Sequence, residues 1–134
     1  MIKGSELLCG LFYKAINQEI GGDNQQAVID CIKENALLMS VSTCICAPFV
    51  EEIVFRKNIF SFFKNDWIAL GVSTLCFGLI HVLSSMDFIH ILPYLFAGAL
   101  FSLFYIFSKR NIWVSIIAHT LANTISFIII VANM

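Results

Sequence analysis

The sequence predicts an all-α protein, a polytopic membrane helix bundle with about four transmembrane helices, and three observations predict this class. Hydrophobic residues make up 59% of the 134-residue chain and charged residues 13%, against roughly 45–50% and roughly 25% in soluble domains. Mean hydropathy is +0.87. Four segments each approach the roughly 20 apolar residues that a helix needs to cross a bilayer. We therefore expect a multi-pass integral membrane protein, located in the cell membrane, with no sheet.

The four expected spans are residues 36–55, 66–84, 88–107 and 112–132. Short connections follow the second and third spans, so consecutive spans should pack as antiparallel neighbours. Residues 1–35 are more polar and contain Gly21 next to Gly22, a pair that interrupts helices. We expect two parts: an N-terminal interfacial or partly disordered arm over residues 1–35, and a transmembrane core over residues 36–134.

Basic residues predict the orientation of the bundle. Arg56, Lys57 and Lys64 follow the first expected span, and Lys109 and Arg110 follow the third. The connection between the second and third spans contains neither Lys nor Arg. Under the positive-inside rule, the two basic connections are cytoplasmic.

Charge and cysteine content narrow the expected partners. The net charge of -1 gives no reason to expect nucleic acid, whereas the apolar spans require membrane lipid. The five cysteines are an odd number without a CxxC pair, so we expect buried, reduced thiols rather than disulfides or metal ligands. They are Cys9, Cys31, Cys44, Cys46 and Cys76.

Two adjacent glutamates stand at the end of the first expected span, in the stretch APFVEEIVFR at residues 47–56. On a helix, Glu52 and Arg56 are four residues apart and share a face, in the favourable order for an ion pair. Glu51 is rotated by about 100° from Glu52 and has no local cation. An isolated glutamate here could simply end the span at the headgroups; otherwise Glu51 is a free carboxylate inside the membrane, which indicates function.

Two histidines favour the functional interpretation. His81 lies in the second span one turn after Phe77, and His119 lies in the fourth span one turn before Asn123. Polar groups in a membrane bundle turn toward one another because lipid offers no partner, so these side chains are expected to converge with Glu51. His90 begins the third span and is expected at the interface.

The depths of these residues in the membrane restrict how they can meet. If Arg56 marks the membrane surface, Glu51 lies only about 7.5 Å inside it, whereas His81 lies about 22 Å from Asp66. Glu51 and His81 then meet only if the first helix continues past Arg56 within the membrane, or if the second span begins outside it.

These residues carry a resemblance to a known family. EEIVFR resembles the EExxxR motif, FGLIH the FxxxH motif and HTLAN the HxxxN motif of the type II CAAX prenyl endopeptidases and their bacteriocin-processing (CPBP) and immunity relatives. The order of the motifs agrees, and the match covers the chain from about residue 36 onward. The resemblance implies an intramembrane protease acting on a peptide or lipidated peptide.

Carried over by position, the resemblance implies that Glu51 is the catalytic glutamate and that His81 assists it. His119 and Asn123 would complete the site, and Glu52 and Arg56 would support the first helix. The chemistry agrees: a carboxylate can take a proton from water and pass it to the leaving amine. His119 and Asn123 are spaced so that both can donate to one oxyanion.

A metal is the open alternative for this site. Glu51, His81 and His119 are acceptable zinc ligands that would leave a fourth position for water. HExxH is absent, and Asn123 suits an oxyanion donor better than a ligand, so a mechanism without a cofactor is the expectation. Two interpretations other than a protease also remain: a non-catalytic immunity or scaffold protein with a peptide-binding pocket, and a transporter subunit that relays protons.

Overall fold

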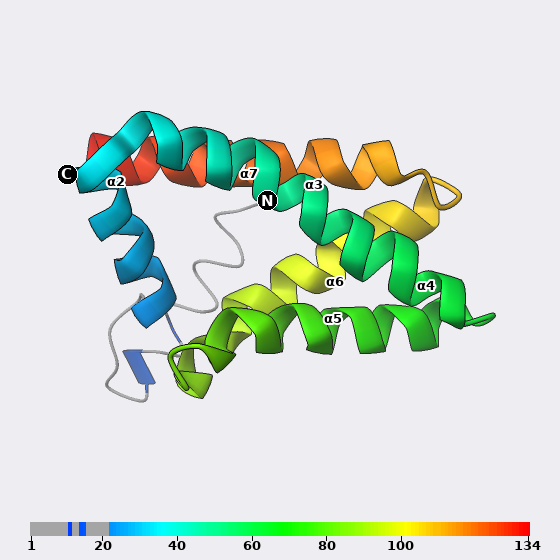
Figure 1. The fold of residues 1–134 in the computed structure, drawn as a ribbon. Helices are drawn as coiled ribbons and strands as arrows, with labels where there is room; N and C mark the ends of the chain where they lie inside the picture. The colour runs from blue at the N-terminus through cyan, green and yellow to red at the C-terminus, as the bar shows by residue number, and fades with distance from the viewer. Residues whose placement is uncertain (1–10, 12–13, 16–21) are drawn as a thin grey trace.

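The computed structural model describes residues 11, 14, 15 and 22–134, and every element within residues 22–134 is a helix (Figure 1). Four of these helices are long and apolar enough to cross a membrane: Gln25–Phe62, Asp66–Leu83, Phe88–Phe107 and Ile112–Ala132. The predicted all-α membrane bundle is therefore confirmed. Most of the predicted arm, up to residue 21, lies outside the described residues.

The first long helix is a chain of segments rather than one regular α-helix. In order, these are α2 (Asp23–Val41), the π-helical η1 (Ser42–Cys46), α3 (Ala47–Glu52), the π-helical η2 (Ile53–Asn58) and α4 (Ile59–Phe62). Within α2 the backbone kinks at Asn35, with φ -154° and ψ 87°. The Asn35 side chain accepts a hydrogen bond from Leu38 N (3.0 Å), which restarts the helix beyond the kink. Residues 23–34, which precede the kink, are helical, and the division into arm and core stays a prediction.

The first span is longer than predicted, and this corrects the sequence analysis. The helix continues past residue 55 to Phe62, so Arg56 and Lys57 are helical residues rather than part of a loop. Arg56 is fully buried, because Glu52 and the bundle interior, rather than lipid headgroups, accommodate its charge. The first helix thus continues past Arg56, as the first of the two ways for Glu51 to meet His81 requires.

Both π-helical segments leave a carbonyl that another helix satisfies. In η1, Ala47 N–H donates to Ser42 O and Pro48 has no N–H, so Thr43 O instead accepts from the Asn123 side chain at 2.9 Å. In η2, Ile59 N–H donates to Arg56 O and Val54 O, and Phe55 O accepts from Ser73 Oγ at 2.7 Å. The wide turns thus tie the first helix to two others.

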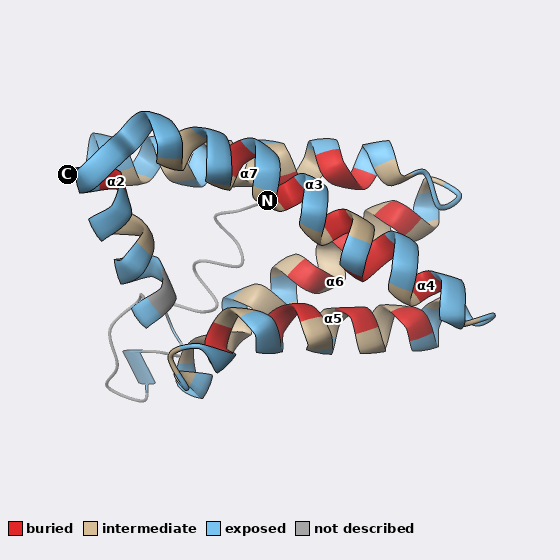
Figure 2. Ribbon diagram, viewed as in Figure 1, coloured by how far each residue is buried: buried red, intermediate tan, exposed pale blue. Residues whose placement is uncertain are grey.

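The remaining helices pack around the middle of the first long helix. They are α5 (Asp66–Leu83), the 3₁₀ turn η3 (Phe88–Ile91), α6 (Leu92–Phe107) and α7 (Ile112–Ala132). Helix α7 lies along η1 and α3, α5 contacts α4 and η2, and α6 runs between α5 and α7 (Figure 1). Buried residues concentrate where these helices face one another, and most of the outer surface is exposed, as expected for side chains in lipid (Figure 2).

Helices α5 and α6 approach closely at two glycines. A Cβ on Gly98 would lie 3.3 Å from Thr74 Cα, and one on Gly78 would lie 2.7 Å from the Leu95 side chain. Small residues at such positions let membrane helices pack backbone to backbone. This contact brings the backbone of α6 within reach of side chains from the first helix.

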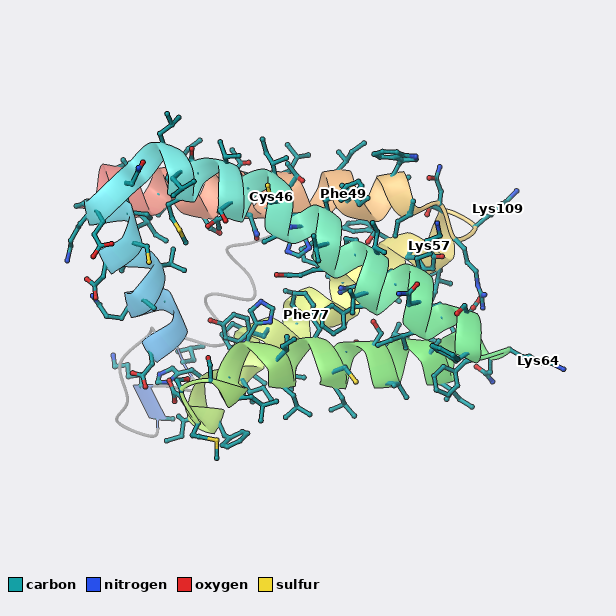
Figure 3. All side chains as sticks on the ribbon, in the orientation of Figure 1. Cys46, Phe49, Lys57, Lys64, Phe77 and Lys109 are labelled. Carbon is teal, nitrogen blue, oxygen red and sulfur yellow. The ribbon has the colours of Figure 1, made fainter. Side chains whose placement is uncertain are left out.

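One end of the bundle carries the basic residues of the two connections and both tryptophans. Asn65 caps the start of α5 through Trp67 N (2.9 Å), and Asn111 caps α7 through Trp113 N (3.1 Å). Arg110 joins the two connections by contacting Asp66 at 2.5 Å and Phe60 O at 3.3 Å. Lys64 and Lys109 extend from the same end (Figure 3). Exposed Trp beside Lys is typical of a membrane interface, while the cytoplasmic orientation stays a prediction.

The cysteine prediction holds only in part. The four described cysteines are free thiols; Cys44 is buried and Cys76 is half-buried. Cys31 and Cys46 are exposed, so the expectation of burial is wrong for these two. A thiol behaves as a small hydrophobe and can face lipid as readily as a protein core. Cys9 lies outside the described residues.

Candidate active site

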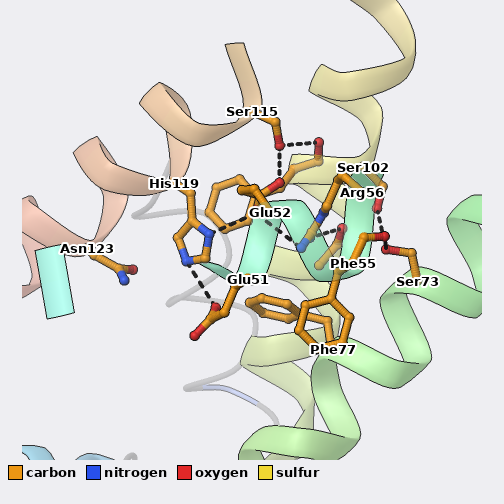
Figure 4. A network of polar contacts seen from close by, with 12 residues as sticks. Glu51, Glu52, Phe55, Arg56, Ser73, Phe77, Ser102, Ser115, His119 and Asn123 are labelled. Carbon is orange, nitrogen blue, oxygen red and sulfur yellow. Dashed lines mark hydrogen bonds and ion pairs between the residues drawn. The ribbon is translucent and has the colours of Figure 1, made fainter. Parts of the chain in front are cut away.

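Glu52 lies at the centre of a buried polar cluster (Figure 4). Its side chain is fully buried, and three groups from two helices contact it. Glu52 Oε1 lies 3.1 Å from Arg56 Nη1 and accepts from His119 Nδ1 at 2.8 Å. Glu52 Oε2 accepts from the Ser115 hydroxyl. The predicted Glu52–Arg56 pair is therefore present, and the same carboxylate also holds a histidine.

Arg56 is fixed from several sides. Its Nη2 donates to Gly98 O at 2.9 Å, whereas its Nη1 contact with Glu52 is an ion pair without hydrogen-bond geometry. The guanidinium lies 4.7 Å from the centre of the Phe77 ring and 5.6 Å from that of Phe101. Cation–π contact of this kind is strongest away from water, so it suits a buried guanidinium.

Glu51 faces the two histidines on the neighbouring side of the helix. Its Oε2 lies 3.7 Å from His119 Nε2, and its Oε1 lies 3.9 Å from His81 Nε2. Glu51 Oε2 is buried and has no hydrogen-bond partner in the part of the chain that the structure describes. The Glu51 side chain remains 23% exposed and that of His81 18%, whereas His119 is buried. The carboxylate can therefore be reached from outside the cluster.

Hydrogen bonds assign the same tautomer to both neutral imidazoles. His81 Nδ1 lies 2.8 Å from Phe77 O, and a carbonyl can only accept, so Nδ1 carries the hydrogen. His119 Nδ1 likewise carries the hydrogen that the Glu52 carboxylate accepts. The two Nε2 atoms then present lone pairs toward Glu51. A carboxylate and two acceptor nitrogens facing one another call for a shared donor such as water.

Asn123 is held at the edge of this cluster. One hydrogen of its side-chain amide goes to Thr43 O at 2.9 Å, which leaves the second amide hydrogen for another acceptor. The structure thus places Glu51 within 4 Å of both His81 and His119, and fixes Asn123 one turn from His119. His90 is not part of the cluster; its Nδ1 lies 2.7 Å from Asp87 Oδ2 at the start of the third span.

Several residues of the cluster were missed in the sequence. Three serines are fully buried along it: Ser73, Ser102 and Ser115. Ser115 stands one turn before His119, and that spacing within an apolar span was the available signal. Helix α6 supplies two aromatic rings that stack on the histidines, and it has no Asp, Glu, His, Lys or Arg that would have marked it as part of the site. Those rings belong to Tyr94 and Phe101.

Zinc held by Glu51, His81 and His119 stays the alternative to a mechanism without a cofactor. The 3.7 Å and 3.9 Å between Glu51 and the two Nε2 atoms are slightly longer than the spacing of about 3.4 Å between tetrahedral zinc ligands with bonds of about 2.0–2.2 Å. Across the described residues, no group of three His, Cys, Asp or Glu is arranged as metal ligands. We therefore derive no step through zinc.

Fold and site together define an integral membrane protein with an acid–base cluster inside its helical bundle. The chain belongs to the type II CAAX prenyl endopeptidase Rce1-like family, whose profile matches residues 33–125. All three motifs lie within that match, so the family resemblance predicted from them is confirmed. Membership of this family supports a membrane protease.

Two curated relatives carry peptidase names. The chain is 35% identical to the putative membrane peptidase YdiL of Bacillus subtilis over 87% of its own length and 52% of that protein. It is 34% identical to the membrane-embedded CAAX protease MroQ of Staphylococcus aureus over 79% of its length and 44% of that protein. An uncharacterized protein of Mycoplasma capricolum is 34% identical over 83% of the chain and 35% of that protein. The chain thus spans about half or less of these relatives. No solved structure matches it.

Proposed function

We propose that this protein is a glutamate-dependent intramembrane endopeptidase that hydrolyses a peptide bond in a membrane-associated or lipidated peptide, in the cell membrane. The observation that carries the proposal is the convergence of Glu51 with the Nε2 atoms of His81 and His119 inside a membrane bundle. Family membership and the peptidase names of two relatives support the reaction class.

In the proposed reaction, Glu51 is the general base. It takes a proton from water while His81 Nε2 accepts the second water hydrogen and orients the oxygen. The oxygen attacks the peptide carbonyl, and the Glu51 proton then passes to the leaving amine. Separations of 3.7–3.9 Å between the acceptors are too long for direct hydrogen bonds and suit a water shared between them.

The tetrahedral oxyanion needs donors, and the proposal assigns this role to Asn123 and His119. Asn123 has one amide hydrogen left after its bond to Thr43 O. In the neutral ring His119 Nε2 has a lone pair, because Nδ1 carries the hydrogen that goes to Glu52. Nε2 therefore donates only after the ring takes up a second proton from solvent, with Glu52 as the counter-ion of the imidazolium. Oxyanion donors of this kind are each worth about 10²–10³ in kcat.

The test is cleavage by the purified chain in lipid vesicles, using a farnesylated CAAX peptide and its unprenylated counterpart. Wild type should cleave at least one peptide. Glu51→Gln should lose about 10²–10⁴-fold in kcat while keeping its melting temperature. EDTA should have no effect. Loss of activity in EDTA that zinc restores would overturn the metal-free mechanism. A folded wild type that binds the peptides without cleaving them would instead favour the non-catalytic scaffold.

A further inference from the structure

Helix α6 contributes no acid or base to the cluster, yet it contacts both histidines face to face. The Tyr94 ring stacks on His81 with centroids 4.6 Å apart and 20° between the planes. The Phe101 ring stacks on His119 with centroids 4.3 Å apart, also at 20°. Tyr94 and Phe101 are seven residues apart, so two turns of one helix face present both rings.

The hydrogen bond at Nδ1 does not by itself hold either imidazole ring in one plane, so a stacking contact is needed as well. The Nδ1 bond of His81 to Phe77 O and that of His119 to Glu52 each fix one ring atom. The ring can still tilt about the line through that bond, and tilting moves Nε2 away from Glu51. A stacked aromatic face opposes this tilt. Phe77 adds further ring contacts, with its centroid 4.6 Å from that of His81 and 5.7 Å from that of His119.

We propose that α6 positions both imidazoles of the site: Tyr94 sets the ring plane of His81, and Phe101 sets that of His119. The two are positioning residues, not catalytic ones, since they act through the histidines. The expected effect on turnover rests on the proposed function, whereas the expected ring planes rest on geometry alone. Ring planes and turnover are therefore measured separately.

The ring planes are measured by NMR on the full chain in detergent micelles, labelled with ¹³C-histidine. The chain has only three histidines, so three Cε1–H signals are expected, and His81→Gln and His119→Gln assign them. Removing a stacked ring also removes its ring current, so the plane is followed instead by the NOEs from each Cε1–H to the Phe77 ring, which contacts both histidines. Tyr94→Leu should change these NOEs for His81 and leave those of His119 unchanged. Phe101→Leu should do the reverse.

Turnover is measured on the same variants with the peptide that wild type cleaves. Tyr94→Leu and Phe101→Leu should each lower kcat by about tenfold or more with KM within about twofold, because a misplaced catalytic group slows the reaction. Tyr94→Phe retains the stack and should restore both the His81–Phe77 NOEs and kcat. Phe96→Leu is the matched control: it removes a half-exposed ring from the same helix and should change neither.

The outcomes separate this proposal from the proposed function. Unchanged histidine–Phe77 NOEs in both Leu variants would overturn the positioning role, whatever the activity. Changed NOEs with unchanged kcat would overturn its relevance to turnover. If wild type cleaves no peptide, the proposed function fails, and the NMR pattern alone decides whether α6 sets the imidazole planes.

Discussion

Glu51 and Glu52 are neighbours in sequence but occupy different environments, because one helical residue corresponds to a rotation of about 100°. Glu52 faces the bundle interior and contacts Arg56, Ser115 and His119. Glu51 faces the two Nε2 atoms and keeps part of its surface exposed. The two glutamates therefore differ in their contacts: Glu52 organises the cluster, and Glu51 is the base in the proposed reaction.

Glu52→Gln should mainly reduce stability. The neutral amide leaves the buried Arg56 without its counter-ion, and breaking a buried pair in this way costs about 3–5 kcal/mol. It also replaces the carboxylate that holds His119 Nδ1. We expect a clearly lower melting temperature in detergent and reduced turnover per folded molecule.

Glu51→Gln is the matched comparison, since it alters the adjacent residue in the same way without leaving a buried cation unpaired. Its melting temperature should equal or exceed that of wild type, while turnover is lost. A fully folded but inactive Glu52→Gln together with an active Glu51→Gln would mean that the two roles are reversed. Equal destabilisation by both variants would mean that the pair is one structural unit.

At the scale of the element, the two π-helical segments around α3 set the direction in which the glutamates point. Each wide turn exposes a carbonyl, and each carbonyl binds a side chain from another helix: Asn123 at Thr43 and Ser73 at Phe55. Pro48 contributes because it offers no N–H to the Thr43 carbonyl. Asn123 thus stabilises the helix that carries Glu51, in addition to its proposed role at the oxyanion.

A double-mutant cycle tests this link between Pro48 and Asn123. Asn123→Ala alone leaves Thr43 O unsatisfied and should cost about 1–3 kcal/mol of stability. In a Pro48→Ala background, the backbone N–H that the substitution introduces can donate to the same carbonyl, so Asn123→Ala should cost less. We expect a coupling energy of about 0.5–3 kcal/mol from chemical unfolding in detergent.

Additive effects in this cycle would show that Thr43 O does not depend on the missing Pro48 N–H. The activity of the same variants tests the proposed oxyanion role of Asn123 separately from stability. If Asn123 also serves the oxyanion, Asn123→Ala should remain slow in the Pro48→Ala background even where its stability is recovered.

The sequence predicted much of this arrangement, and what it missed has physical causes. Three spans and the Glu51–His81–His119 cluster follow from apolar length and from ionisable residues that lipid cannot accommodate. The end of the first span was misplaced because Arg56 normally marks a membrane surface, and burial by a partner on the same helix is invisible to hydropathy. The stacking role of α6 was missed because aromatic residues are common in any apolar span.

At the scale of the whole molecule, the N-terminal end of α2 contacts a part of the bundle that is distant in sequence. From the kink at Asn35 it descends toward the connection between α5 and α6 (Figure 1). There Asp87 Oδ2 accepts from Asp23 N at 3.2 Å, at the first turn of α2. A Cβ on Gly22 would lie 2.6 Å from the same carboxylate oxygen, so the backbone approaches Asp87 closely. We call this contact the α2 anchor.

The α2 anchor should depend on pH through Asp87. The hydrogen bond with His90 is the main cause that holds the pKa of Asp87 below its ordinary value of 3.8. A lowered pKa in the folded state means that the ionised carboxylate stabilises the fold above the ordinary value, and that this contribution disappears as the pH falls through the lowered one. Amide exchange of residues 23–34, corrected for intrinsic rates, should therefore stay slow down to about pH 3.8 and accelerate below it.

Asp87→Asn is the control for this titration, because the amide oxygen can still accept from Asp23 N but carries no charge to lose. Exchange in that variant should be faster than in wild type at neutral pH and nearly independent of pH down to the same limit. Gly22→Ala should free residues 23–34 at every pH by steric conflict with Asp87. If Asp87→Asn retained the full acid-induced loss of protection, a different group would have to control the anchor.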